Sequence, residues 1–318
     1  MFNSNLKEKF IKAYTTSISL REACVSAFNV FEKYESEWGA DLCTKSAEEL
    51  QPIVDASVGF RARSKHLRMS ILCDYVKWCM KNGEPGACDG MLRVQISGVE
   101  KMRQQTVTSP LHLQVYLNKI FAPENEETTD NIYRCFYWLA YAGMEEEEIL
   151  KVRISEVDFS NMTVKHNGKE YPIYREALRA FKNCVNLTQF LYKHPNYSSD
   201  KIVYKDRAPG DTVIRGLKAP PSTQTVRVEL SRRSKEAIES GITDLKLSYF
   251  RVWLSGLFYR MYERELAGFP VDFSSAAAQF MDGKSYKLES GRNTREAYQR
   301  KVAKGYFEDY EIWKMTFA

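Results

Sequence analysis

Apolar side chains recur at the spacing of an α-helix throughout the first hundred residues. One stretch contains Phe10 and Tyr14, and the next runs from Ala23 to Tyr34. A further helix is predicted over residues 64–81, where Asn82-Gly83 ends the pattern. No segment of this region alternates with the period of two that is typical of a strand. The N-terminal region is therefore predicted to be helical. The inward stripe of the last helix is expected to be Leu67, Ile71, Tyr75 and Trp78.

From residue 109 onward, one predicted β-hairpin interrupts a series of helices. Ser109-Pro110 is a typical helix start, because serine caps the first free N–H groups and proline suits the first helical position. Residues 161–174, NMTVKHNGKEYPIY, form two short alternating runs around Asn167-Gly168, a strong signal for a hairpin turn. Helices are predicted over residues 110–121, 129–141, 145–152, 175–192, 225–240 and 247–266, with an irregular stretch over 194–224 and a helical tail over 292–316 that breaks at Gly305.

The chain has 318 residues, enough for about two domains of typical size. Residues 97–108 are polar and lack apolar periodicity, so the boundary is placed there. We expect a mainly α-helical fold with a small β-hairpin or sheet. Its two domains are predicted to span residues 1–104 and 105–318.

Composition narrows the class of protein further. No apolar run approaches the roughly 20 residues that span a bilayer, and the N-terminus lacks the apolar region of a signal peptide, so a cytoplasmic protein is expected. Seven cysteines are an odd count without a CxxC pair, which argues against a disulfide framework and a zinc site. They are interpreted as buried thiols.

Charge is distributed unevenly along the chain, although the net charge is only +5. Residues 109–160 contain four basic and ten acidic side chains, whereas residues 161–300 contain 24 basic and 15 acidic ones. This asymmetry suggests one face for a polyanion and another left to solvent.

Three groups of basic residues are candidates for contact with nucleic acid. A cluster at the start of the predicted helix 64–81 suits phosphate, although a solvated helix start is an equal alternative. Two lysines flank the hairpin turn, where solvation of the turn is the common use of lysine. A third group lies on helix 225–240, with its middle pair expected to point outward. The groups are Arg61, Arg63, Lys65 and Arg68; Lys165 and Lys169; and Arg227, Arg232, Arg233 and Lys235.

No self-contained catalytic or metal-binding pattern is visible. The four histidines are scattered through unrelated elements, and neither a phosphate-binding glycine loop nor a nucleophile elbow occurs. No metal or cofactor is expected.

Residues 142–158, AGMEEEEILKVRISEVD, resemble the "TGLRxSELLxLRWxDID" segment of the tyrosine recombinase (phage integrase) family without a gap. Tyr171-Pro172-Ile173 of the hairpin stands where the family has "VPL". Residues 247–251, LSYFR, occupy the "HxLR" position, and residues 294–298, TREAY, resemble "TTxxY". The resemblance implies a two-domain clamp, with a helical core-binding-like domain followed by a catalytic-like domain.

This family joins and cuts DNA through a tyrosine nucleophile, with two arginines and a lysine that stabilise charge in the transition state. Here Glu145 stands at the first arginine, Ser248 at the box histidine and Lys284 at the later histidine. Arg251 and Tyr298 remain, although an ion pair at a helix start and a structural tyrosine are their plainer interpretations. The resemblance thus implies a relic site without strand cleavage, in which Arg251 could contact a DNA phosphate.

Among such degenerate chains, the sequence is most similar to lytic-cycle repressors of SPbeta-type Bacillus prophages. The resemblance implies a repressor whose partner is a double-stranded DNA operator, and it leaves open a protein or peptide antirepressor as a further partner. Two alternatives are an active, divergent recombinase that uses Arg251, a hairpin lysine and Tyr298, and a phage protein that binds a host protein through residues 109–160.

Overall fold

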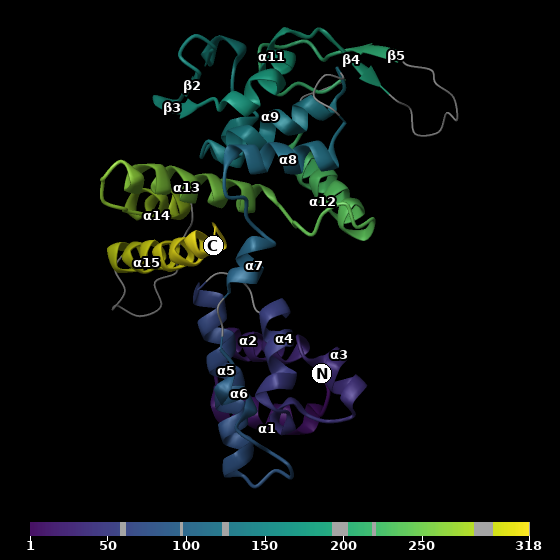
Figure 1. Ribbon diagram of the computed structural model, residues 1–318, viewed down its shortest axis with the longest axis vertical. Helices are drawn as coiled ribbons and strands as arrows, with labels where there is room; N and C mark the ends of the chain where they lie inside the picture. The colour runs from purple at the N-terminus through teal and green to yellow at the C-terminus, as the bar shows by residue number, and fades with distance from the viewer. Residues whose placement is uncertain are drawn as a thin grey trace. The chain divides into compact units, whose positions relative to one another are not determined.

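The computed structural model describes residues 1–57, 62–95, 98–122, 127–192, 203–217, 221–282 and 295–317 (Figure 1). Contacts divide the chain into two compact units. The first contains residues 1–102 and 273–318, and the second contains residues 103–272. The first division lies close to the predicted boundary, but residues 273–318 group with the N-terminal unit and not with the second domain, where the sequence placed them. The functional roles assigned to the two domains stay predictions.

The first unit is helical in its described residues, as the spacing predicts. Three rings form the centre of its core: Phe10 of α1, Phe28 of α2 and Tyr75 of α5, with centroids 4.9 to 6.1 Å apart. In the predicted stripe of α5, Ile71 and Tyr75 are buried, whereas Leu67 is exposed. The helices are α1 (Ser4–Tyr14), α2 (Ile18–Asn29), α3 (Glu32–Trp38), α4 (Ala47–Ser57), α5 (Ala62–Lys81), α6 (Gly90–Arg93) and α7 (Val99–Arg103), with a 3-10 turn η1 (Leu42–Thr44).

An ion pair is fully buried in this unit. Lys7 of α1 donates to both carboxylate oxygens of Glu35 of α3, at 2.6 Å to Oε1 and 2.5 Å to Oε2. Glu35 also accepts the backbone N–H of Leu42. Because each charge is compensated inside the core, the pair fixes α1 against α3 and η1.

The C-terminal helices α14 (Ser274–Met281) and α15 (Arg295–Lys314) pack on each other, and α15 contacts α5. The 3-10 turn η4 (Met315–Phe317) follows. The break predicted at Gly305 is wrong, because α15 runs through it without interruption. Tyr306, Tyr310 and Trp313 are buried along α15, and their packing stabilises the helix across the glycine.

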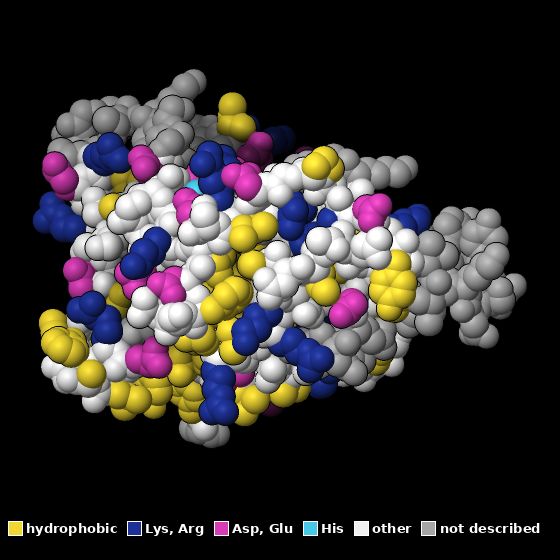
Figure 2. Space-filling model, turned by 90° about the horizontal axis from the view of Figure 1, so that it is seen from above, with side chains coloured by type: hydrophobic (Ala, Val, Ile, Leu, Met, Phe, Trp, Pro, Cys, Tyr) yellow, Lys and Arg dark blue, Asp and Glu magenta, His cyan; other side chains and the backbone are white. Residues whose placement is uncertain are grey.

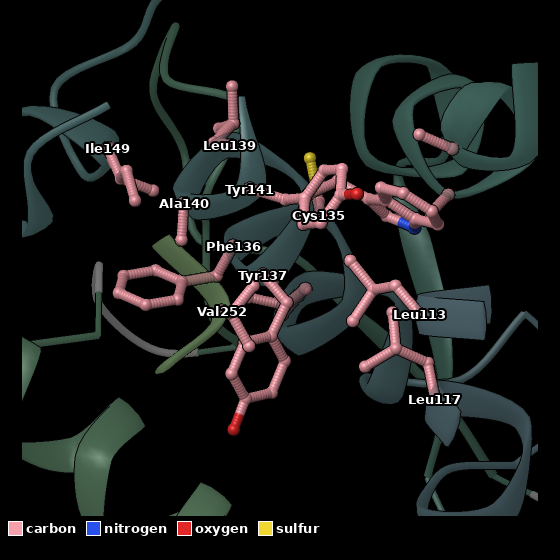
Figure 3. Close-up of a cluster of buried hydrophobic side chains, with 14 of the residues drawn as sticks. Leu113, Leu117, Cys135, Phe136, Tyr137, Leu139, Ala140, Tyr141, Ile149 and Val252 are labelled. Carbon is pink, nitrogen blue, oxygen red and sulfur yellow. The ribbon is translucent and has the colours of Figure 1, made fainter. Parts of the chain in front are cut away.

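The second unit is built around α9 (Asp130–Tyr141), which packs against α11 (Leu178–Asn186) and α13 (Tyr249–Leu266) (Figure 1). Nearly the whole of α9 is buried. Figure 3 shows side chains of α9 with Leu113 and Leu117 of α8 (Pro110–Ile120) and Val252 of α13. A Cβ at Gly256 of α13 would lie 1.8 Å from the carbonyl oxygen of Tyr141, so only glycine permits this approach of α13 to α9. The unit also contains α10 (Glu146–Ile149), α12 (Thr223–Glu239) and the 3-10 turns η2 (Ile154–Glu156) and η3 (Arg175–Ala177).

The predicted hairpin is confirmed as β2 (Thr163–His166) and β3 (Lys169–Pro172), with His166 opposite Lys169. Asn167 and Gly168 have φ angles of 48° and 71°, the pair of positive values that a type I′ turn requires. β1 (Val157–Asp158) extends this sheet beside β2.

A second sheet was not predicted. β4 (Gln189–Tyr192) pairs antiparallel with β5 (Val203–Asp206). The predicted helix 175–192 is therefore too long, since α11 ends at Asn186, and part of the stretch expected to be irregular is a strand.

The described helices include none that is long and apolar enough to cross a membrane. All seven cysteines are free; five are buried, and Cys73 and Cys88 are half-buried.

Candidate nucleic-acid interface

Glu145, at the position of the first arginine in the resemblance, caps the N-terminus of α10. Its carbonyl oxygen accepts the N–H groups of Glu148 and Ile149, both at 3.0 Å. Burial raises the pKa of Tyr249 far above its usual range, and the carboxylates of Glu146 and Glu145 add to the shift. The start of α10 thus places negative charge beside the first turn of α13.

Glu146, next to Glu145, is buried and bound by Arg227 of α12. The Arg227 guanidinium donates from Nε to Oε1 at 2.7 Å and from Nη2 to Oε2, which is a bidentate contact. This pairing raises the pKa of Arg227. An unpaired carboxylate at this depth would destabilise the fold. The first role of Arg227 is therefore to neutralise Glu146, and not to bind a ligand.

Ser248 and Arg251 lie in the first turn of α13. The Ser248 side chain is the N-cap and accepts the backbone N–H of Arg251 at 3.4 Å. Serine is a preferred residue for this role, so Ser248 has a clear structural function where the resemblance expects histidine. Arg251 is half-buried, and its backbone carbonyl oxygen accepts a hydrogen bond from the Ser255 hydroxyl at 2.8 Å.

The remaining relic positions lie elsewhere in the chain. Tyr298 is a half-buried residue of α15 and belongs to the first unit, whereas Glu145, Ser248 and Arg251 belong to the second. Lys284 lies outside the described residues.

The two hairpin lysines, Lys165 and Lys169, are exposed. Lys165 lies opposite Glu170 in the register of β2 and β3. Both lysines therefore present their charge to solvent on the strands beside the turn.

His166, which the sequence analysis did not single out, attaches this hairpin to the rest of the unit. It is buried, with Nδ1 2.9 Å from Glu156 and Nε2 3.0 Å from Glu148. A hydrogen bond from Lys151 lowers the pKa of Glu148, and one with His166 lowers it further by a smaller amount. Burial opposes a lower pKa at Glu156, but the backbone N–H of Arg153 and the His166 ring outweigh it. The alternation of β2 indicates this role, since His166 follows buried Val164 by two residues.

The four basic residues of α12 all form ion pairs. Arg232 is half-exposed and binds Glu229 and Glu236 on its own helix. Lys235 lies 3.6 Å from Glu239.

Arg233 is turned inward, which corrects the expectation that the middle pair points out of the helix. It donates to Asp130 of α9 at 2.8 and 3.1 Å, and its guanidinium lies 5.4 Å from the centre of the Phe121 ring. Its side chain is 26% exposed, against 49% for Arg232. The expectation therefore holds for Arg232 alone.

The charge asymmetry between the two segments does not correspond to two separate faces. Asp130 and Glu146 belong to the acidic segment but are buried, and they are paired with Arg233 and Arg227 of the basic segment. On the face shown in Figure 2, lysine and arginine side chains lie interspersed with acidic side chains among the described residues. Some of the charges that make the two segments differ therefore form ion pairs that hold α12 against α9 and α10.

The N-terminal basic cluster lies at the start of α5, which begins at Ala62, two residues before the predicted start. Arg63 and Lys65 are in its first turns, and Arg68 follows as a half-buried residue. Arg61 lies outside the described residues.

Comparison with known proteins identifies the N-terminal segment. Residues 1–81 match the family described as "MrpR, N-terminal core-binding domain". This segment is therefore similar to an MrpR-type core-binding domain, which confirms the resemblance for this part of the chain. No curated protein matches the sequence.

Solved structures of integrases are similar to the chain at low identity. The Tn1549 transposon integrase, residues 82–397, in complex with circular intermediate DNA, matches at 11% identity and a TM-score of 0.35, over 94% of this chain and 98% of that one. A lambda integrase dimer, residues 75–356, bound to a COC' core site, matches at 12% identity and a TM-score of 0.33, over 92% and 100%. The fold class follows from the described elements, which are mainly helices with two small sheets.

Proposed function

We propose that this protein is a sequence-specific repressor that binds double-stranded DNA to keep a prophage lysogenic, on a tyrosine-recombinase-like scaffold without strand cleavage. The observation that carries the proposal is the match of residues 1–81 to the MrpR N-terminal core-binding domain. The gap-free resemblance of residues 142–158 to the recombinase segment supports the same scaffold for the second unit.

The proposed loss of cleavage is supported by the surroundings of the relic positions. Glu145 supplies negative charge where the reaction needs a cation beside the phosphate, and Ser248 is used as a helix cap. A carboxylate near a scissile phosphate repels it, and a serine cannot replace the imidazole as a proton donor of suitable pKa.

The exposed cations of the second unit are the proposed DNA contacts: Lys165, Lys169, Arg232 and Lys235. Half-buried Arg251 is proposed as a further contact. Arg227 and Arg233 each bind a buried carboxylate, which is their structural role. Contact with DNA is proposed for them only in addition to that role. In the first unit, the proposal keeps Arg61, Arg63, Lys65 and Arg68.

Replacing Lys165 and Lys169 together by alanine is expected to weaken duplex binding without changing sequence preference. Each phosphate contact contributes about 0.9 to the slope of log K against log salt, so the double variant should lower that slope by about two. Binding to a fixed duplex would be measured by fluorescence anisotropy across a salt series.

The matched control removes two other exposed lysines, Lys119 of α8 and Lys182 of α11, and so has the same net charge. The control should bind more tightly than the hairpin variant and keep the wild-type slope. Equal slopes for the two double variants would exclude the hairpin from the interface.

A further inference from the structure

His166 has a carboxylate against each of its two ring nitrogens. Nδ1 lies 2.9 Å from Glu156 of η2, and Nε2 lies 3.0 Å from Glu148 of α10. The side chain is only 6% exposed, and both distances are those of direct hydrogen bonds. An imidazole donates from both nitrogens only when both are protonated, because the neutral ring has one N–H and one lone pair. The two contacts are therefore those of an imidazolium that bridges two carboxylates.

A neutral ring would lose one of these contacts. Asn167 Nδ2 lies 3.2 Å from Nε2 of His166 and 2.5 Å from Oε2 of Glu148. A ring without its proton at Nε2 can accept a hydrogen bond from this amide, but its lone pair then faces the Glu148 carboxylate, which repels it. Loss of that proton therefore breaks the direct link between β2 and α10.

The two carboxylates stay ionised at neutral pH. A hydrogen bond from Lys151 lowers the pKa of Glu148 and raises the pKa of Lys151. Burial acts against ionisation at Glu156, but hydrogen bonds from the backbone N–H of Arg153 and from the His166 ring outweigh it and lower the pKa of this carboxyl. Glutamates with lowered pKa values keep their charge above about pH 4. Histidine is the side chain that ordinarily changes charge between about pH 5 and 8, so the ring is the member of this group that responds in that range.

The turn end of the hairpin depends on this ring. Val164, at the base of the hairpin, is buried and pairs with β1, so the base is held without His166. Within residues 165–170, all of which the structure describes, only His166 is buried. On β3, Lys169 lies opposite His166 with its side chain exposed, and half-buried Tyr171 follows, whose pKa is raised by burial. Lysine and tyrosine do not ordinarily change charge between about pH 5 and 8.

We propose that protonated His166 is a positioning residue for duplex binding, which holds the turn end of the hairpin against α10 and η2 and so fixes Lys165 and Lys169 for contact with DNA phosphates. Loss of the ring proton frees this end, and duplex affinity falls as the pH rises through the titration of the ring. The inference rests on the proposed function, because it requires the hairpin lysines to contact DNA. It adds that a single proton controls this contact.

The first measurement uses the full chain without DNA. Nitrogen-15 NMR of ring-labelled histidine should show both ring nitrogens of His166 protonated at about pH 6, and one of them losing its proton as the pH is raised. His166→Gln assigns the signal, because it removes this ring alone. A His166 ring with a single protonated nitrogen at about pH 6 would overturn the proposal.

The second measurement is duplex binding by fluorescence anisotropy across a salt series, at about pH 6 and at the higher pH where NMR shows the ring to be neutral. The wild-type slope of log K against log salt should fall by about two at the higher pH, because two phosphate contacts are lost. Lys165→Ala with Lys169→Ala should have the lower slope at both pH values, and so should His166→Gln. The comparison of wild type with the lysine variant holds even if His166→Gln does not fold.

The matched control is again Lys119→Ala with Lys182→Ala, which should keep the wild-type change of slope with pH. A wild-type slope that is equal for the protonated and the neutral ring would overturn the inference and leave the proposed function intact. A change of slope that persists in the hairpin lysine variant would do the same. Absence of duplex binding at both pH values would instead contradict the proposed function, on which the inference rests.

Discussion

Replacing Arg233 by alanine is expected to lower the free energy of unfolding by about 3 kcal/mol, because it leaves a buried carboxylate without its cation. The Asp130 side chain is only 8% exposed, and among the described residues it would keep the backbone N–H of Ala122, at 2.8 Å, as its hydrogen-bond donor. The variant also loses the contact between the guanidinium and the Phe121 ring. Urea denaturation followed by circular dichroism would measure the change.

The neighbouring residue provides the control. Arg232→Ala removes an arginine from the same helix. Its partners are exposed Glu236 and Glu229, which is 21% exposed but keeps Arg233 as a second cation, and surface pairs of this kind contribute less than about 1 kcal/mol. Equal destabilisation by the two variants would contradict the structural role assigned to Arg233. Because Arg233→Ala disturbs the fold, Arg232→Ala is also the cleaner variant for testing whether α12 contacts DNA.

The second large effect concerns strand cleavage. A nicked duplex that traps the covalent intermediate of a tyrosine recombinase is expected to yield no adduct with this protein on a denaturing gel. Losing one transition-state donor typically costs ~10²–10³ in rate, so losing both the first arginine and the box histidine should cost ~10⁴ or more. The charge of Glu145 would add to this cost.

Tyr298→Phe serves as the matched variant for this experiment. It removes only the hydroxyl that would act as nucleophile and should leave duplex affinity unchanged. An adduct that forms with the wild type and disappears in Tyr298→Phe would show that the site is active. The alternative of a divergent recombinase would then replace the repressor.

Helices and the hairpin could be predicted because local sequence determines them. Ser109-Pro110 begins α8, and Asn167-Gly168 supplies the two positive φ angles of the turn between β2 and β3. The second sheet could not be found in this way, because β4 and β5 are separated by ten residues and are brought together only by tertiary contacts. Gly305 gave the wrong signal for the same reason, since the buried aromatic residues that follow it, Tyr306, Tyr310 and Trp313, hold α15 in place through tertiary contacts.

The candidate site was predicted by residue type but not by partner. The buried stripe of α12 contains Val226 and Leu230, and position 233 follows them by seven and three residues, at the edge of that stripe. This spacing indicates that Arg233 turns inward and Arg232 does not. The partner of Arg233, Asp130, is determined by how α9 and α12 pack, and this packing could not be predicted from the sequence.

The measurement that tests the central claim most directly is selection of bound fragments from sheared phage and host DNA at roughly 150 mM salt, where weak non-specific binding is suppressed, followed by sequencing. The account predicts a shared motif recovered upstream of several phage genes. Recovery of a single attachment-like locus, or of no enriched fragment, would contradict it.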